Sequence, residues 1–265
     1  MRPERGEKSV VAGSDGAGLV NAVGAGVRRF RAGDRVYSYS YPNPKGGFHA
    51  ELAVVAESKV APVPRGYSLK DAGAIATTGL TALQGVDDAL HVKRGERVIV
   101  HGASGGVGSL AVQFAKRRGA RVFATASGSD GVRLARRLGA DVAVDGKRDD
   151  ILAEARRFAP RGVDAVLAFA GGKPLAKCLD ALKPRGGRLA YPNGVEPAPR
   201  KRKNVRTTAY DAVPGVRAFE RLNRAIVAAR LKAPITETYP MERAAAAYRA
   251  VRRGHVVGKL ALRIR

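Results

Sequence analysis

A glycine-rich turn carries the clearest chemical signal in this sequence. Residues 101–108 read His-Gly-Ala-Ser-Gly-Gly-Val-Gly, after a short β-branched run at 97–101 and before a segment with apolar residues at helical spacing. Such a turn brings the main chain close to a pyrophosphate, and the following helix offers N–H groups and the positive end of its dipole. The groups that would hold the phosphates belong to Ala103, Ser104, Gly105, Gly106, Val107 and Gly108. A tight turn without a ligand is the alternative, but the flanking strands and helix favour a dinucleotide site.

The end of the next predicted strand indicates which dinucleotide this would be. NAD sites usually carry Asp or Glu there, about 20 residues after the turn, to bind the ribose 2′-hydroxyl. Here the strand at 121–126 ends in Thr-Ala and is followed by Ser-Gly-Ser, with no carboxylate before Asp130. The small alanine leaves room for a 2′-phosphate, to which Ser127, Ser129 and Arg133 could donate. The sequence therefore predicts NADPH as the cofactor, with Asp130 as a helix N-cap.

The elements around the turn alternate between strands and helices. β-Branched runs predict strands at 97–101, 121–126, 141–144, 163–168 and 187–191. Helical spacing predicts helices that include 110–115, 132–138, 149–158 and 174–183. Strands separated by helices of this length predict an α/β fold, a Rossmann-type doubly wound parallel sheet covered on both faces. Gly171 follows the strand at 163–168, a place from which it could approach the cofactor.

The two ends of the chain do not show this alternation of strands and helices. Residues 9–64 are rich in glycine turns and predict short strands, with strand character at 34–39 and 49–56. A helix is predicted over 72–90, preceded by a helix start at Ser68. Near the C-terminus, the pattern predicts helices at 216–227 and 241–252 and a final strand at 259–264.

Composition restricts the class of protein. The 265 residues contain 45% hydrophobic residues, no apolar run that could span a bilayer and no apolar stretch behind the charged residues 1–8. The single cysteine, Cys178, excludes an internal disulfide and a cysteine-rich zinc lobe, which fits a cytoplasmic protein. The formal net charge of +25 suggests either a polyanion partner or a solvated basic surface. Because no nucleic-acid-binding motif accompanies the charge, a solvated surface is favoured over nucleic-acid binding.

Five segments together resemble a known family: the quinone oxidoreductase (zeta-crystallin) branch of the medium-chain dehydrogenases/reductases. They are residues 13–18, 32–36, 79–82 and 101–108 and the C-terminal Gly-Lys-Leu at 258–260. The resemblance implies an incomplete GroES-like, β-rich catalytic domain at 1–85, a Rossmann NAD(P)-binding domain at 86–233 and a return to the catalytic domain at 234–265. Related chains begin earlier, with a tyrosine-bearing loop near the nicotinamide, so an N-terminally truncated chain is expected.

The resemblance also implies the positions that line the cleft between the two domains. Thr81, Asn193, Gly194, Tyr210 and Lys259 would lie along the cofactor. Tyr41 and His49 are candidates for substrate contact, and no catalytic residue is assigned. The family resemblance further suggests a homodimer through the edge of the Rossmann sheet.

No metal is predicted. Zinc-dependent relatives carry Gly-His-Glu where this chain has Gly-Ser-Asp at 13–15, and the four histidines are scattered. The zinc-free branch reduces quinones or α,β-unsaturated carbonyl compounds, so the predicted activity is NADPH-dependent reduction of such a small molecule. An enoyl thioester reductase and a non-catalytic NADPH- or nucleic-acid-binding derivative of the same fold are the alternatives.

Overall fold

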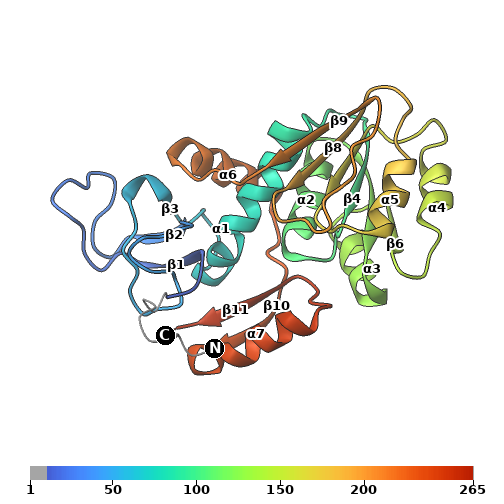
Figure 1. Cartoon of the computed structure of the whole chain (residues 1–265). Coiled ribbons are helices and arrows are strands. Elements are labelled where there is room, and N and C mark those ends of the chain that lie inside the picture. The colour runs from blue at the N-terminus through green and yellow to red at the C-terminus, as the bar shows by residue number, and fades with distance from the viewer. Residues whose placement is uncertain (1–10, 265) are drawn as a thin grey trace.

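The computed structural model describes residues 11–264 and contains a six-stranded parallel sheet (Figure 1). Its strands are β4 (Arg97–His101), β5 (Arg121–Ala126), β6 (Val142–Asp145), β7 (Ala165–Ala168), β8 (Gly187–Pro192) and β9 (Val205–Tyr210). They lie in the order β6-β5-β4-β7-β8-β9. Numbered by appearance, this is 3-2-1-4-5-6, the order of a doubly wound dinucleotide-binding sheet. The predicted fold class is confirmed.

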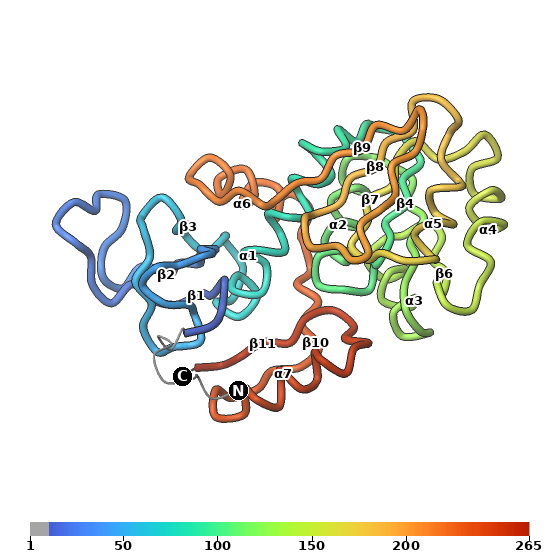
Figure 2. The backbone as a smooth tube through the Cα atoms, viewed as in Figure 1, coloured from blue at the N-terminus to red at the C-terminus, as the bar shows by residue number. Residues whose placement is uncertain are grey.

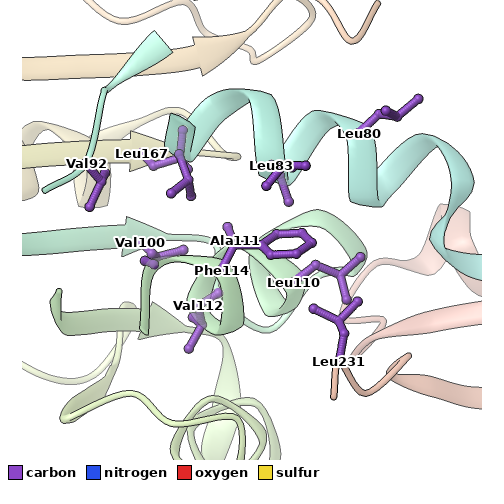
Figure 3. Packing of buried hydrophobic residues seen from close by; sticks show 14 of the residues in the cluster. Leu80, Leu83, Val92, Val100, Leu110, Ala111, Val112, Phe114, Leu167 and Leu231 are labelled. Atoms are coloured by element: carbon purple, nitrogen blue, oxygen red, sulfur yellow. The ribbon is translucent and has the colours of Figure 1, made fainter. Parts of the chain in front are cut away.

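Helices cover both faces of this sheet. Helices α2 (Gly106–Arg117), α3 (Gly128–Arg137), α4 (Ile151–Phe158) and α5 (Lys173–Asp180) contact its strands, and α1 (Leu69–Gln84) and α6 (Val216–Ala229) pack on α2. Side chains alternate along each strand, so Val98 and Val100 of β4 join the core that includes α1, α2 and α6, while Ile99 joins the core with α4 and α5. On the first face, Leu83 of α1 lies over Phe114 of α2 (Figure 3).

A second, antiparallel sheet lies on the far side of α1 from the parallel sheet. It consists of β1 (Asp15–Leu19), β2 (Arg35–Tyr39) and β3 (Val60–Pro62) in that order. Asp15 and Tyr39 are paired neighbours in its register. A short 3-10 helix at Glu57–Lys59 precedes β3. Helix α1 packs against α2 on one side and against β1 and β2 on the other, so it connects the two sheets (Figure 2).

The C-terminal segment returns toward β1. It forms β10 (Ile235–Pro240), a 3-10 turn (Met241–Arg243), α7 (Ala244–Arg253) and β11 (Lys259–Arg263), and β10 and β11 pair in parallel. Figure 1 shows β11 and α7 running beneath the space between the two sheets. No helix within residues 11–264 combines the length and apolar character that a membrane crossing requires.

The prediction of a strand at 49–56 is wrong. No strand of residues 11–264 pairs with this segment, and Leu52 and Val54 are 69% and 66% exposed. An extended segment becomes a strand only where a neighbouring strand satisfies its N–H and C=O groups. Apolar residues alone do not provide such a neighbouring strand. Strands β9 and β10 were not predicted. Both carry mixed polar residues and are only partly buried, so neither shows the continuous apolar run of a buried strand.

Candidate cofactor-binding site

The predicted glycine turn connects β4 to α2 at the edge of the sheet where the strands end. The N–H groups of Gly102 and Ala103 both donate to the carbonyl oxygen of Thr125 in β5, at 3.1 and 2.9 Å. These bonds fix the turn across the ends of two neighbouring strands. This is the edge at which open parallel sheets bind their ligands.

Two glycines of the turn have different surroundings. A Cβ atom on Gly108 would lie 2.2 Å from the carbonyl oxygen of Gly102, so only glycine lets α2 sit this close to the turn. A Cβ on Gly105 would meet no atom nearer than 3.6 Å. Gly105 is also the N-cap of α2, and no side chain caps the helix there. No side chain therefore occupies the N–H groups of the first turn, and this cradle fits a pyrophosphate.

The C-terminal segment forms a wall of the same turn. The N–H of Gly258 donates to the carbonyl oxygen of Ser104 at 2.7 Å, and Gly258 forms a parallel bridge with Gly105. The Lys259 stem lies so close to Gly106 that a Cβ on Gly106 would be 2.7 Å from the Lys259 Cγ. The structure thus places Lys259 beside the turn, as the resemblance implied.

An ion pair links this wall to the second sheet. The Lys259 Nζ lies 3.5 Å from the Asp15 Oδ2, and both side chains are mostly buried, with 20% and 18% of their areas exposed. The same carboxylate oxygen accepts the N–H of Thr77 in α1 at 3.2 Å. Asp15 therefore joins β1, α1 and β11 next to the glycine turn. In the sequence, Asp15 stands out only as the last residue of the Gly-Ser-Asp segment that replaces a metal motif.

Thr81, Asn193, Gly194 and Tyr210 form a second group at the carboxyl ends of β8 and β9. The Tyr210 hydroxyl donates to the Thr81 carbonyl oxygen at 2.9 Å, and the Asn193 N–H donates to the Tyr210 carbonyl oxygen at the same distance. The Asn193 side chain donates to Asp211 at 2.7 Å. Gly194 follows in the same turn, with a φ of +88°. Residues from three separate segments of the chain are thus brought together.

Comparisons with known proteins agree with this geometry. Residues 2–65 match the family described as "Alcohol dehydrogenase GroES-like domain" and residues 106–205 match "Zinc-binding dehydrogenase". A probable quinone oxidoreductase of Schizosaccharomyces pombe is 32% identical over 95% of this chain and 79% of its own length. The chain belongs to the quinone oxidoreductase branch of the medium-chain dehydrogenase/reductase superfamily.

Other relatives add detail. A quinone oxidoreductase of Pseudomonas aeruginosa is 34% identical over 70% of this chain, and the match spans only 56% of that protein's length. A 2-haloacrylate reductase of a Burkholderia species is 30% identical over 97% of this chain and 82% of its own. Among solved structures, this chain is similar to an NAD-dependent alcohol dehydrogenase (TM-score 0.84, 31% identity, 97% and 83% coverage). It is equally similar to a mycobacterial protein complexed with NADPH (TM-score 0.84, 29% identity, 96% and 82% coverage).

The adenosine ribose of the cofactor would lie at the end of β5. The helix that follows β5 begins earlier than predicted. Helix α3 begins at Gly128 with Ser127 as its N-cap, so the assignment of Asp130 as the N-cap is wrong. Asp130 lies in the first turn of α3, where its carboxylate accepts the N–H of Gly131 at 2.8 Å and lies 3.2 Å from the His255 Nε2. The glycine at 128 permits an earlier helix start than the sequence pattern indicated.

His255 is the residue at this end that sequence reasoning missed. Its Nδ1 lies 3.3 Å from the Ser127 Oγ, and the Ser127 N–H donates to the Ser104 Oγ at 3.3 Å. Ser129 and Arg133 are exposed on α3 nearby. A lone histidine after a basic helix carries no signal of its position, because only the return of the C-terminal segment brings it to β5.

The remaining predicted positions are Gly171, Tyr41 and His49. A Cβ on Gly171 would be 2.4 Å from the Pro197 carbonyl oxygen, so Gly171 faces that loop. Tyr41 is 72% exposed. The His49 Nδ1 lies 3.1 Å from the Tyr248 hydroxyl of α7, and burial lowers the His49 pKa although Asp15 acts in the opposite direction. Substrate contact by Tyr41 or His49 stays a prediction. Within residues 11–264, no three His, Cys, Asp or Glu side chains gather as a metal site would require.

His101, at the end of β4, is buried beneath the turn. Its Nδ1 lies 2.6 Å from the Thr125 Oγ1 and 3.8 Å from the Cys178 Sγ. Burial lowers the His101 pKa to about 4, although a main-chain contact from Gly171 acts in the opposite direction. Burial also raises the Cys178 pKa to about 12, so this thiol is not ionised at neutral pH. Both groups are therefore neutral parts of the core below the cofactor site.

This burial predicts a pH dependence of stability. The folded-state pKa of His101 lies below the value of about 6.5 expected in the unfolded chain, so the unfolded state binds the proton more readily as pH falls. The stability contribution is present above pH 6.5 and is lost toward pH 4. Between pH 7 and pH 5 we expect His101 to account for a loss of about 2 kcal/mol in the free energy of unfolding. Urea unfolding of wild type and His101→Asn at both pH values measures this, and equal pH dependence in the two proteins would refute it.

Proposed function

We propose that this chain is an NADPH-dependent oxidoreductase that transfers hydride to a quinone or an α,β-unsaturated carbonyl compound. The observation that carries the proposal is the glycine turn, whose uncapped helix N-terminus and open Gly105 face form a phosphate cradle at the end of a parallel sheet. The bound nicotinamide would supply the hydride, while the protein binds and orients the two reactants.

The preference for NADPH rests on the residues of this chain, since its structural neighbours include both an NAD-dependent enzyme and an NADPH complex. No carboxylate stands at the end of β5. The next carboxylate along the chain, Asp130, accepts the Gly131 N–H and lies beside His255, and Asp145 at the end of β6 pairs in register with Ala126 of β5. Ser127 and the exposed Arg133 are available as donors to a 2′-phosphate.

The substrate class follows from the relatives and from the cleft. Quinones and 2-haloacrylate, named for the relatives, both contain an electron-poor carbon–carbon double bond. In this chain, Tyr39 lies opposite Asp15 in the second sheet, and burial together with Asp211, Asp15 and Tyr41 raises its pKa. Tyr39 therefore keeps its proton at neutral pH. Lys259 adds a positive charge beside the glycine turn, where it would face cofactor phosphate or developing negative charge.

The domain layout and assembly belong to the same proposal. We place the domain boundaries near residues 85 and 233, so that the cleft between the β-rich part and the Rossmann part would contain the Asp15–Lys259 ion pair. A homodimer through the β9 edge of the parallel sheet would continue that sheet across two copies. Size-exclusion chromatography with light scattering tests the dimer.

Turnover tests the activity. Purified protein is mixed with NADPH and with a panel of a benzoquinone, a short enone, 2-chloroacrylate, a crotonyl thioester and a simple ketone. We expect NADPH oxidation with the quinone or the enone and none with the ketone. Saturable NADPH binding without oxidation by any member of the panel would contradict the enzymatic part of the proposal.

Gly105→Ala separates cofactor binding from folding. The added Cβ meets no atom within 3.5 Å, so the free energy of unfolding should change by less than about 0.5 kcal/mol. The same methyl group projects toward the phosphate cradle, so NADPH affinity should fall at least about tenfold. Fluorescence titration measures the affinity, and Gly215→Ala, where a Cβ meets nothing within 4 Å, is the matched control. Unchanged affinity in Gly105→Ala would show that phosphate does not approach this face.

A further inference from the structure

A basic groove lies at the opposite end of α2 from the glycine turn. It has a volume of about 460 Å³ and is lined by three ends of helices: Gln113, Lys116 and Arg117 of α2, Arg137 and Leu138 of α3, and Ala228, Ala229 and Arg230 of α6, followed by Lys232. The lining contains five cations and no carboxylate. Lys116 comes ten residues after Gly106, which places it about 15 Å along the helix axis from the phosphate cradle. The basic groove is thus separate from the cofactor site.

A second cavity extends the basic groove. It has a volume of about 620 Å³ and shares Arg230 and Lys232 with the first, while Arg65, Tyr67 and one carboxylate, Asp71, lie farther along. The Tyr67 hydroxyl donates to the Leu231 carbonyl oxygen at 2.7 Å, which holds the tyrosine in place. Each cavity is of the size that small-molecule ligands occupy.

The positive charge of the basic groove is only partly neutralised. Lys116 is paired with Asp141 at 2.8 Å, and one Arg117 nitrogen donates to the Ala228 carbonyl oxygen at 3.3 Å. Each helix C-terminus contributes the equivalent of about half a negative charge, and three such ends meet here. These ends and Asp141 together offset about half of the five positive charges. Within residues 11–264, Arg137, Arg230 and Lys232 have no carboxylate in ion-pair range.

Arg230 is held in the groove at a conformational cost. It is the C-cap of α6 and adopts a left-handed backbone, with φ of +46° and ψ of +47°. Glycine is the usual residue at such a position, and another L-residue costs about 1 kcal/mol there. Strained backbone is often retained at functional positions. The cationic side chain at this strained position therefore indicates that its charge has a function in the groove.

We propose that the basic groove binds a phosphate chain, a small anion with at least two phosphoryl groups, through Arg137, Arg230 and Lys232. Arginine offers planar paired donors that match phosphate oxygens, and lysine adds a point charge. The three side chains come from α3, from the end of α6 and from the segment after it, so they can contact successive phosphoryl groups. This site is independent of the proposed oxidoreductase activity.

The test uses tripolyphosphate as the probe. Calorimetric titration is carried out at 150 mM salt with saturating NADPH, so that the cofactor site does not contribute. The groove variant is Arg137→Gln, Arg230→Gly and Lys232→Gln combined, and the control is Arg156→Gln, Arg249→Gln and Arg252→Gln, three exposed cations on α4 and α7. Both variants lose the same charge. Arg230→Gly also suits the left-handed backbone, so this change should not impair folding.

We expect wild type and control to bind one tripolyphosphate per chain with the same affinity, and the groove variant to bind at least about tenfold more weakly. Orthophosphate should bind far more weakly than tripolyphosphate. Absence of saturable binding by wild type, or equal weakening in both variants, would overturn the proposal. ATP distinguishes the source of the phosphate chain: tighter binding of ATP that is lost in Tyr67→Ala indicates a nucleotide, and affinity equal to that of tripolyphosphate indicates recognition of the phosphate chain alone.

Discussion

Gly108→Ala is expected to weaken NADPH binding about a hundredfold and to destabilise the fold by about 1–3 kcal/mol. The added Cβ would lie 2.2 Å from the Gly102 carbonyl oxygen and within 3 Å of two further main-chain atoms of the turn. Main-chain atoms cannot rotate away as a side chain can. The strain is therefore relieved only if α2 moves off the turn, which displaces the N–H groups that would bind the pyrophosphate.

Two measurements test this expectation. Urea unfolding gives the stability and fluorescence titration gives the NADPH affinity of Gly108→Ala, with Gly215→Ala as a control at an open, extended position before α6. Gly105→Ala is measured alongside, because that variant should lose NADPH affinity while its free energy of unfolding stays unchanged. Wild-type affinity in Gly108→Ala would show that the position of α2 relative to the turn does not determine cofactor binding.

Phe219→Ala is expected to lower the free energy of unfolding by about 3–5 kcal/mol. Phe219 lies on α6 and is 1% exposed, and its ring meets the Tyr37 ring of β2 edge-on, with the centroids 5.3 Å apart. The Tyr37 hydroxyl donates to Asn223 of the same helix at 2.6 Å. This contact joins the second sheet to a helix that packs on α1 and α2, so its loss should loosen the cleft as well as the core.

Chemical denaturation measures the effect of Phe219→Ala, and two variants of α6 calibrate it. Phe219→Leu retains most of the buried apolar volume and should cost less than half as much. Val227→Ala, at a side chain that is 47% exposed on the same helix, should cost less than about 1 kcal/mol. A loss below 1 kcal/mol in Phe219→Ala would show that the two parts of the chain do not depend on this contact.

The parts of the fold that the sequence predicts correctly are those with local causes. Strands such as β4 and β5 are continuous apolar, β-branched runs, because both faces of a parallel sheet are covered. The glycine turn is recognisable because three requirements coincide within eight residues: a tight turn, an open face at Gly105 and close packing at Gly108. The spacing of the glycines in the sequence follows directly from these requirements.

Other features depend on long-range contacts and have no local signal. The edge strand β9 is only half covered, so its mixed sequence resembles a loop. His255 and Asp130 are 125 residues apart, and Lys259 meets Asp15 only because the C-terminal segment returns past the glycine turn. The segment 49–56 has the residues of a strand but no partner strand among residues 11–264. Periodicity reveals which faces are apolar, but it does not reveal which distant segment will cover them.

Parallel titration of the purified protein with NADPH and NADH tests the central claim most directly. The phosphate cradle at Gly105 and the absence of a carboxylate at the end of β5 predict saturable binding of NADPH, at least about tenfold tighter than binding of NADH. Absence of binding by either nucleotide would contradict the assignment of the glycine turn. Tighter binding of NADH would contradict the predicted role of the β5 end and of Ser127 and Arg133.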